Sequence, residues 1–197
     1  MIPEYFAIIG AVIASIGGFY YLYETIVGKT KPNRVTWLLW GLLPMIIFIA
    51  QRIQGVGDLS WATFVAGFTP FLVVGASVLN KKAYWKTMRR DYYIMASAVV
   101  GIILWAITDN ANLAIFFSLS ADMLAGLPTF IKSYKHPETE SWAAYAISAF
   151  GFGLGVLAIQ TYTFENYAFI IYLFLANGVL AVLSSRKSSD AILRTEP

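Results

Sequence analysis

A single acidic residue inside an apolar stretch is the strongest chemical signal in this sequence. Asp122 lies within the apolar residues 111–132, where an ionisable group costs about 2.5–3.5 kcal/mol on membrane-insertion scales. Helical spacing puts small or polar side chains on the same face: Ser118, Ala125, Thr129 and Ser133. Such a stripe should face a protein interior or a wet cavity. Asp122 therefore either binds a proton, a substrate cation or a substrate hydroxyl, or it is a structural group that holds another helix.

Aromatic and amide side chains are placed to complete a pocket around such a group. Trp40 and Tyr145 lie one helical turn beyond Trp37 and Trp142, where they either belong to the aromatic belt as well or flank a central pocket and stack on a ring or a sugar. Trp37 and Trp142 are expected in the aromatic belt at the membrane interface. Asn177 has up to four hydrogen bonds to place, and it either links helices or contacts a substrate.

Three further residues are candidates for coupling or movement. Glu24 lies near the end of the first apolar stretch, within reach of Lys29 or Arg34. It either takes part in proton coupling and gating or extends its carboxylate to the membrane surface. Pro128 and Pro70 each remove one backbone hydrogen bond from a helix. Interrupted helices in transporters line the permeation route, so both prolines are candidate hinges.

The residues that most enzymes require are missing. The sequence has no cysteine, and its single histidine stands between Lys135 and Pro137. No phosphate loop, dinucleotide fingerprint or metal-ligand spacing occurs. A retinal photoreceptor would need a lysine midway along residues 166–185, which contain none. We therefore expect neither an enzyme nor a resident cofactor or metal.

The elements that must position these residues are membrane helices. Of 197 residues, 58% are hydrophobic and 13% are charged, against roughly 25% charged in soluble domains. A membrane-spanning helix needs about 20 mostly apolar residues. Spans are predicted at 4–27, 34–52, 60–79, 91–108, 111–132, 141–160 and 166–185. The first span lacks the basic segment of a signal peptide, so we expect it in the mature protein.

The first and last thirds of the chain repeat at an offset of 105 residues. The offset pairs Pro32 with Pro137, Thr36 with Ser141, Trp37 with Trp142, Trp40 with Tyr145, and Lys81-Lys82 with Arg186-Lys187. This predicts an all-α integral membrane protein of seven helices, with two parallel three-helix repeats joined by a linker helix. The predicted units are repeat 1 (1–82), a basic interfacial linker with helix four (83–110), repeat 2 (111–187) and a cytoplasmic tail (188–197).

The basic residues fix the expected orientation. With seven spans, every lysine and arginine except Arg52 falls on the side opposite the N-terminus. Positive residues stay cytoplasmic, so we expect the inner membrane, with the N-terminus outside and the C-terminus inside. The basic and aromatic segment 80–90 is expected to lie at anionic lipid headgroups. It is too short, and too close to the membrane, to indicate nucleic-acid binding.

Residues 127–135 (Leu-Pro-Thr-Phe-Ile-Lys-Ser-Tyr-Lys), followed by Ser141, resemble the PQ-loop motif of the SWEET, semiSWEET and PQ-loop transporters. The motif's glutamine is replaced by Thr129, and the first repeat has Tyr23-Glu24 instead. The resemblance spans essentially the whole chain. It implies two three-helix units that rock about a substrate cavity on their shared axis. Asn177 matches an asparagine that lines the sugar pocket in that family. The PnuC vitamin transporters share the bundle, but their orientation looks inverted relative to this charge pattern.

The sequence therefore predicts a transporter. It would move a small polar or ring-bearing solute by alternating access, through facilitated diffusion or proton coupling. The alternative is a non-transporting receptor or sorting protein, because the peptide-sorting KDEL receptors share this bundle. The expected partners are the solute and the lipid bilayer, and a homo-oligomer is compatible with the sequence. The identity of the solute and the direction of transport stay open at this stage.

Overall fold

The computed structural model describes residues 2–83, 85–86, 88–89, 91–93, 95–96, 99–100, 103 and 110–193, and these residues form helices and connections without strands. The helices are α1 (Phe6–Ile26), α2 (Arg34–Ile53), α3 (Ser60–Leu79), α5 (Ala111–Lys135), the short 3₁₀ helix η1 (Pro137–Thr139), α6 (Trp142–Leu157) and α7 (Phe164–Leu193). The all-helical prediction is confirmed, and six predicted spans match the six α-helices of the described ranges.

Two predicted spans need comment. The fourth, 91–108, lies mostly outside the described residues, although the described residues 91–93, 95–96, 99–100 and 103 are helical. Asn33 donates from Nδ2 to Asp91 Oδ2 at 3.1 Å, which joins this segment to the start of α2. The last helix continues to Leu193, beyond the predicted end at 185, because no glycine or proline follows Gly178 until Pro197.

Short polar side chains and glycines set several helix ends. Asn33 Oδ1 accepts from the backbone N–H groups of Val35 and Thr36 and caps α2, while Asn110 and Ser141 cap α5 and α6 in the same way. Gly28 and Gly55 have φ values of 79° and 76° and follow the last residues of α1 and α2, a left-handed conformation that glycine adopts at low cost.

Neither of the two prolines paired by the 105-residue offset begins an α-helix. Pro32 lies before the capping residue of α2, and Pro137 begins η1, so α6 starts only at Trp142. The prolines shape the connections that lead into these helices.

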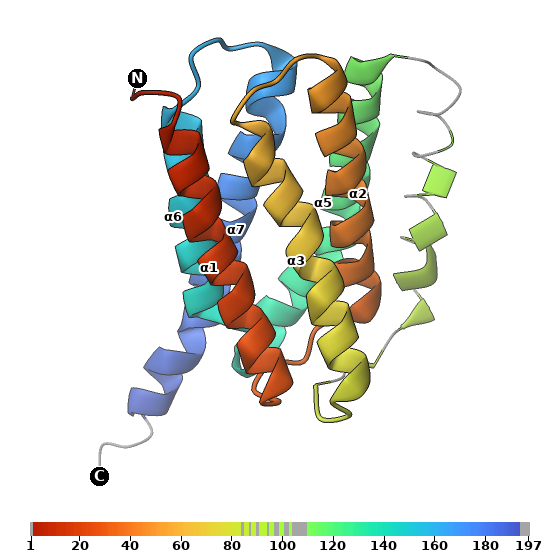
Figure 1. The fold of residues 1–197 in the computed structure, drawn as a ribbon. Coiled ribbons are helices and arrows are strands. Elements are labelled where there is room, and N and C mark those ends of the chain that lie inside the picture. The colour runs from red at the N-terminus through yellow and green to blue at the C-terminus, as the bar shows by residue number, and fades with distance from the viewer. Residues whose placement is uncertain are drawn as a thin grey trace.

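The six α-helices form a closed ring (Figure 1). Around the ring, α1 contacts α3, α3 contacts α2, α2 contacts α5, α5 contacts α7, α7 contacts α6, and α6 returns to α1. The N-terminus and the end of α7 lie at opposite ends of the bundle, called upper and lower here as Figure 1 shows them. Side chains far apart in sequence therefore meet on one central axis.

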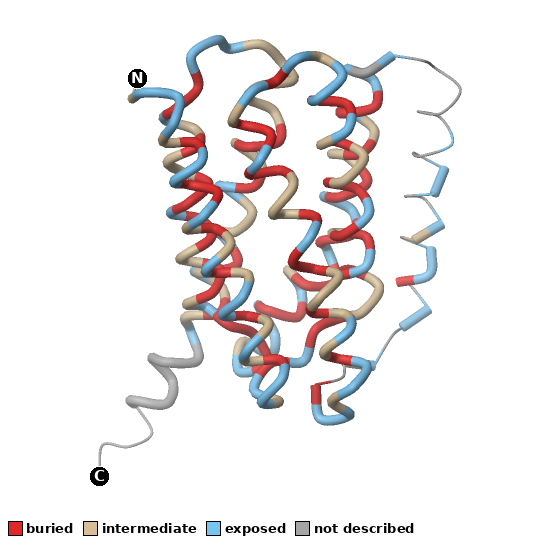
Figure 2. The backbone as a smooth tube through the Cα atoms, in the orientation of Figure 1, coloured by how far each residue is buried: buried red, intermediate tan, exposed pale blue. Residues whose placement is uncertain are grey.

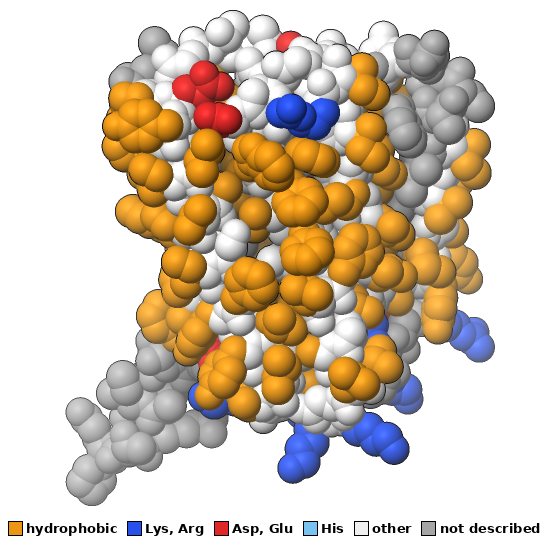
Figure 3. Space-filling view, in the orientation of Figure 1, with side chains coloured by type: hydrophobic (Ala, Val, Ile, Leu, Met, Phe, Trp, Pro, Cys, Tyr) orange, Lys and Arg blue, Asp and Glu red, His pale blue; other side chains and the backbone are white. Residues whose placement is uncertain are grey.

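The helices are apolar outside and carry polar groups inside. Figure 3 shows a hydrophobic band across one face, with charged side chains toward the two ends. Figure 2 shows the buried residues on the inner faces of the helices. Buried polar side chains include Ser118, Thr129, Gln51 and Glu140, whereas large apolar groups such as Phe150 and Val182 are exposed. This inversion suits a lipid environment, because the exterior requires no hydrogen bonds.

In the described part of the chain, five helices are long and apolar enough to cross a membrane: α1, α2, α3, α5 and α7. The sixth, α6, is apolar but has 16 residues. Glycines bring α6 close to α1: a Cβ built on Gly10 would lie 2.4 Å from the Gly151 carbonyl oxygen. Close packing through small residues is a common basis of helix association in membranes, so these glycines serve helix packing.

Candidate binding cavity

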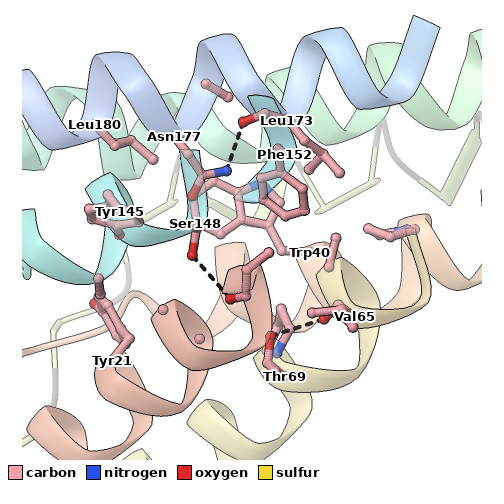
Figure 4. Close-up of a pocket in the computed structure, with 18 of the residues that line it drawn as sticks. Tyr21, Trp40, Val65, Thr69, Tyr145, Ser148, Phe152, Leu173, Asn177 and Leu180 are labelled. Atoms are coloured by element: carbon pink, nitrogen blue, oxygen red, sulfur yellow. Dashed lines mark hydrogen bonds between the residues drawn. The ribbon is translucent and has the colours of Figure 1, made fainter. Parts of the chain in front are cut away.

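A cavity lies on the axis of the six-helix ring. It encloses about 670 Å³, including the part open to solvent, and all six α-helices contribute to its lining. Figure 4 shows its side chains pointing inward from α1, α2, α3, α6 and α7. The lining contains Trp40, Asp122, Tyr145 and Asn177 and also Pro70. The structure thus brings together five of the seven residues that sequence reasoning selected.

The lower half of the cavity has an aromatic wall. The ring centroids of Tyr21 and Trp37 are 4.3 Å apart, and those of Tyr21 and Tyr145 are 5.7 Å apart. Trp40 meets Trp37 edge-on at 5.5 Å. Trp37, Trp40 and Pro44 line the cavity together, because residues three or four apart share one face of a helix.

The two tryptophans predicted for the aromatic belt lie in different environments. Trp142 is 45% exposed, as expected at a membrane interface, but Trp37 is only 5% exposed and lines the cavity. The prediction for Trp37 is wrong, because its face of α2 packs against Tyr21 of α1. The two tryptophans paired by the 105-residue offset therefore lie in different environments.

Asp122 is 2% exposed, and no other member of its stripe is more exposed than that: Ser118, Ala125, Thr129 and Ser133. The predicted inward orientation of this face of α5 is confirmed. Asp122 Oδ2 accepts a hydrogen bond of 2.7 Å from the Tyr172 hydroxyl of α7. Its other oxygen, Oδ1, is buried without a hydrogen-bond partner in the described part of the chain. One half of the carboxylate therefore holds a helix, and the other half is available to a ligand.

Asn177 donates from Nδ2 to the Leu173 carbonyl at 2.9 Å (Figure 4). This bond lies within α7, so it does not link two helices. Pro70 lies in the cavity wall, and so does Pro44, which sequence reasoning did not select. Each proline leaves the backbone carbonyl four residues earlier without its helical N–H partner. The two carbonyls are those of Ala66 and Trp40, and both residues line the cavity.

Two selected residues do not line the cavity. Glu24 is half-buried near the lower end of α1, one turn beyond Tyr21, and its backbone carbonyl accepts from Lys29 N and Thr30 N. Pro128 lies inside α5, which continues past it to Lys135. Arg34, one of the two partners suggested for Glu24, donates to the Ser77 hydroxyl and carbonyl.

Sequence reasoning missed a buried charged network below the cavity. Glu140 is fully buried, and its Oε2 accepts hydrogen bonds of 2.8 Å from both Tyr21 and Tyr145. Lys132 Nζ lies 2.5 Å from Glu140 Oε1 and also donates to the Lys31 carbonyl. We call Tyr21, Lys132, Glu140 and Tyr145 the Glu140 network. It joins α1 and the α1–α2 connection to α5 and α6.

The network also adds to two expectations. Lys132 was counted among the basic residues on the side opposite the N-terminus, and it is only 2% exposed there. Tyr145 presents its ring to the cavity, but its hydroxyl is donated to Glu140. The only sequence signal was an acidic residue directly before the capping Ser141. Nothing in the pattern showed that this connection folds inward.

Among the described residues that line the cavity, Asp122 is the only charged one. No group of three or more His, Asp or Glu residues in the described ranges could hold a metal ion. Comparison of the chain with protein-family models, curated proteins and solved structures finds no significant match.

Proposed function

We propose that the chain is a membrane transporter that moves a small polar or ring-bearing solute by alternating access. The observation that carries this proposal is an axial cavity lined by all six helices, whose lining includes Asp122 with one carboxylate oxygen unpaired among the described residues. An ionisable group buried inside a membrane bundle is costly and marks substrate or proton pathways. A central site shared by several helices is where a carrier binds its solute.

Helix packing supports two related three-helix units. Shifting α1, α2 and α3 by 105 residues gives 111–131, 139–158 and 165–184, which overlap α5, α6 and α7. The shift also exchanges contacts: α1 with α6 becomes α5 with α2, α1 with α3 becomes α5 with α7, and α2 with α3 becomes α6 with α7. This is the packing expected of parallel repeats around a common axis, as the resemblance to the SWEET and PQ-loop transporters implies.

Two apolar clusters lie along the axis, one at each end of the cavity. The upper cluster includes Ala11, Ile47, Ile115, Ile159 and Phe169, and the lower cluster includes Tyr21, Trp37, Val73, Tyr145 and Leu180. Separating one cluster while the other stays packed would open the cavity to one side at a time. In this mechanism Asp122 Oδ1 binds the solute or a proton, and Pro70, Pro128 and Pro44 allow α3, α5 and α2 to bend.

The charge pattern supports an orientation with the upper end outside. Among the described side chains, Arg52 is at the upper end, and the other lysines and arginines belong to the lower end or the connections there. Basic residues remain cytoplasmic, so the lower end, with the Glu140 network, would face the cytoplasm.

Mass spectrometry of small molecules retained by the purified protein, followed by uptake of each into proteoliposomes, tests the proposal. We expect at least one retained solute to accumulate until its concentrations inside and outside are equal, or beyond that in a proton gradient. Solutes that raise the melting temperature but never enter the vesicles would instead indicate a receptor or sorting protein.

A further inference from the structure

The hydrogen-bonding groups of the cavity divide into those already used and those left free. Tyr21 and Tyr145 donate to Glu140, and Tyr172 donates to Asp122. Thr69 donates to the Val65 carbonyl, and Ser148 donates to the Ala14 carbonyl at 3.4 Å (Figure 4). These bonds commit most of the cavity's polar side chains to the protein itself.

Three buried polar atoms of the lining have no hydrogen-bond partner within the described ranges. They are the indole N–H groups of Trp37 and Trp40, which only donate, and Asp122 Oδ1, which accepts when the carboxylate is ionised. A buried polar group without a partner is costly, so a ligand that pairs with it gains correspondingly. These three atoms comprise two donors on α2 and one acceptor on α5.

The remaining surface is aromatic and carries no positive charge. Six of the lining residues have aromatic rings: Tyr21, Trp37, Trp40, Tyr145, Phe152 and Tyr172. The described lining contains no lysine, arginine or histidine, so a bound anion would meet Asp122 without a counter-ion from these residues. Rings of this kind favour stacking with a flat partner.

We propose that the solute is a planar ring compound, neutral or singly positive, with at least one hydrogen-bond donor. Its donor binds Asp122 Oδ1, and an acceptor, where the solute carries one, receives an indole N–H from Trp37 or Trp40. A sugar has several hydroxyls, each needing partners, and a lining made mostly of aromatic and aliphatic groups offers them few. Anionic solutes are excluded by Asp122. This inference rests on the proposed function, because it names the solute that the same cavity would carry.

Three probes of nearly equal size separate charge from shape: benzamide is neutral, benzamidine is a cation and benzoate is an anion. Glucose serves as the sugar. Binding to the purified full chain is measured by tryptophan fluorescence and by the melting temperature. We expect benzamide and benzamidine to change both signals, and benzoate and glucose to change neither. A response to benzoate or glucose equal to that of benzamide, or no response to any probe, overturns the inference.

Variants locate the contacts. Trp37→Phe and Trp40→Phe keep a ring but remove the N–H, and at least one should weaken benzamide binding about fivefold. Trp142→Phe is the matched control, because Trp142 lies on the exposed face of α6 and should leave binding unchanged. Asp122→Asn should remove the preference for benzamidine over benzamide. If neither Trp37→Phe nor Trp40→Phe differs from the control, the assigned contacts are wrong.

Uptake distinguishes this inference from the proposed function. If the probes bind with the expected pattern but are not taken up into proteoliposomes, the proposed solute class stands and the proposal of transport is refuted. If glucose or benzoate is taken up and Asp122→Asn abolishes that uptake, the proposal of transport stands and the proposed solute class is refuted.

Discussion

Removing one partner of the buried Lys132–Glu140 ion pair should destabilise the protein far more than removing both. Both side chains are almost fully buried, with Nζ and Oε1 2.5 Å apart. In Lys132→Met the Glu140 carboxylate keeps the two tyrosine hydroxyls but loses its ammonium partner. Breaking a buried pair in this way costs about 3–5 kcal/mol. At about 2–4 °C per kcal/mol for a chain of this size, the melting temperature should fall by about 6–20 °C.

The double variant Lys132→Met/Glu140→Gln carries the decisive comparison. Without either charge no ion stays buried and unpaired, and replacing a whole buried pair is often nearly neutral. The glutamine can still accept the hydrogen bonds from Tyr21 and Tyr145. We therefore expect the double variant to melt well above the Lys132→Met variant, within about 2 kcal/mol of the wild type.

Thermal unfolding in detergent, followed by tryptophan fluorescence, measures these differences. Lys135→Met is the control, because Lys135 is exposed near the end of the same helix and should melt like the wild type. The losses of stability in the single variants Lys132→Met and Glu140→Gln can be summed and compared with the loss in the double variant. If the sum equals that loss within about 0.5 kcal/mol, the two side chains are not coupled. That result would refute the argument that burial makes this pair interdependent.

Three further predictions test the coupling, the packing and the orientation. Asp122→Asn should abolish any pH dependence of solute uptake into proteoliposomes, and an unchanged dependence would remove proton coupling through this residue. Gly10→Ala should lower the melting temperature by about 2–12 °C, since the added Cβ meets the opposing backbone and overpacking costs about 1–3 kcal/mol. Gly178→Ala, with nothing within 4 Å of the added atom, should match or exceed the wild type, and equal losses at both sites would contradict the close α1–α6 approach. The chain has no cysteine, so a membrane-impermeant maleimide should label Thr161→Cys on intact cells and Lys81→Cys only after permeabilisation, and the reverse pattern would invert the proposed orientation.

The sequence determined the helices and the inner face of α5. A segment in lipid must satisfy its own backbone hydrogen bonds, so apolar stretches of about 20 residues predict helices closely. An ionisable group in such a stretch must avoid lipid, so Asp122 and the residues at its helical spacing were predictably buried. The same logic anticipated that Trp40, Tyr145 and Asn177 would face inward.

Tertiary packing decided the rest. Helical periodicity defines a face but not its neighbour, and in a membrane an apolar face suits lipid and protein equally. The 105-residue offset pairs Trp37 with Trp142, yet Trp37 packs against Tyr21 of α1 whereas Trp142 is exposed. In the sequence, Glu140 follows a helix that ends in lysines and has the pattern of an ordinary surface acid. It is buried because the connection between α5 and α6 folds beneath the cavity, where Lys132, Tyr21 and Tyr145 together stabilise its charge.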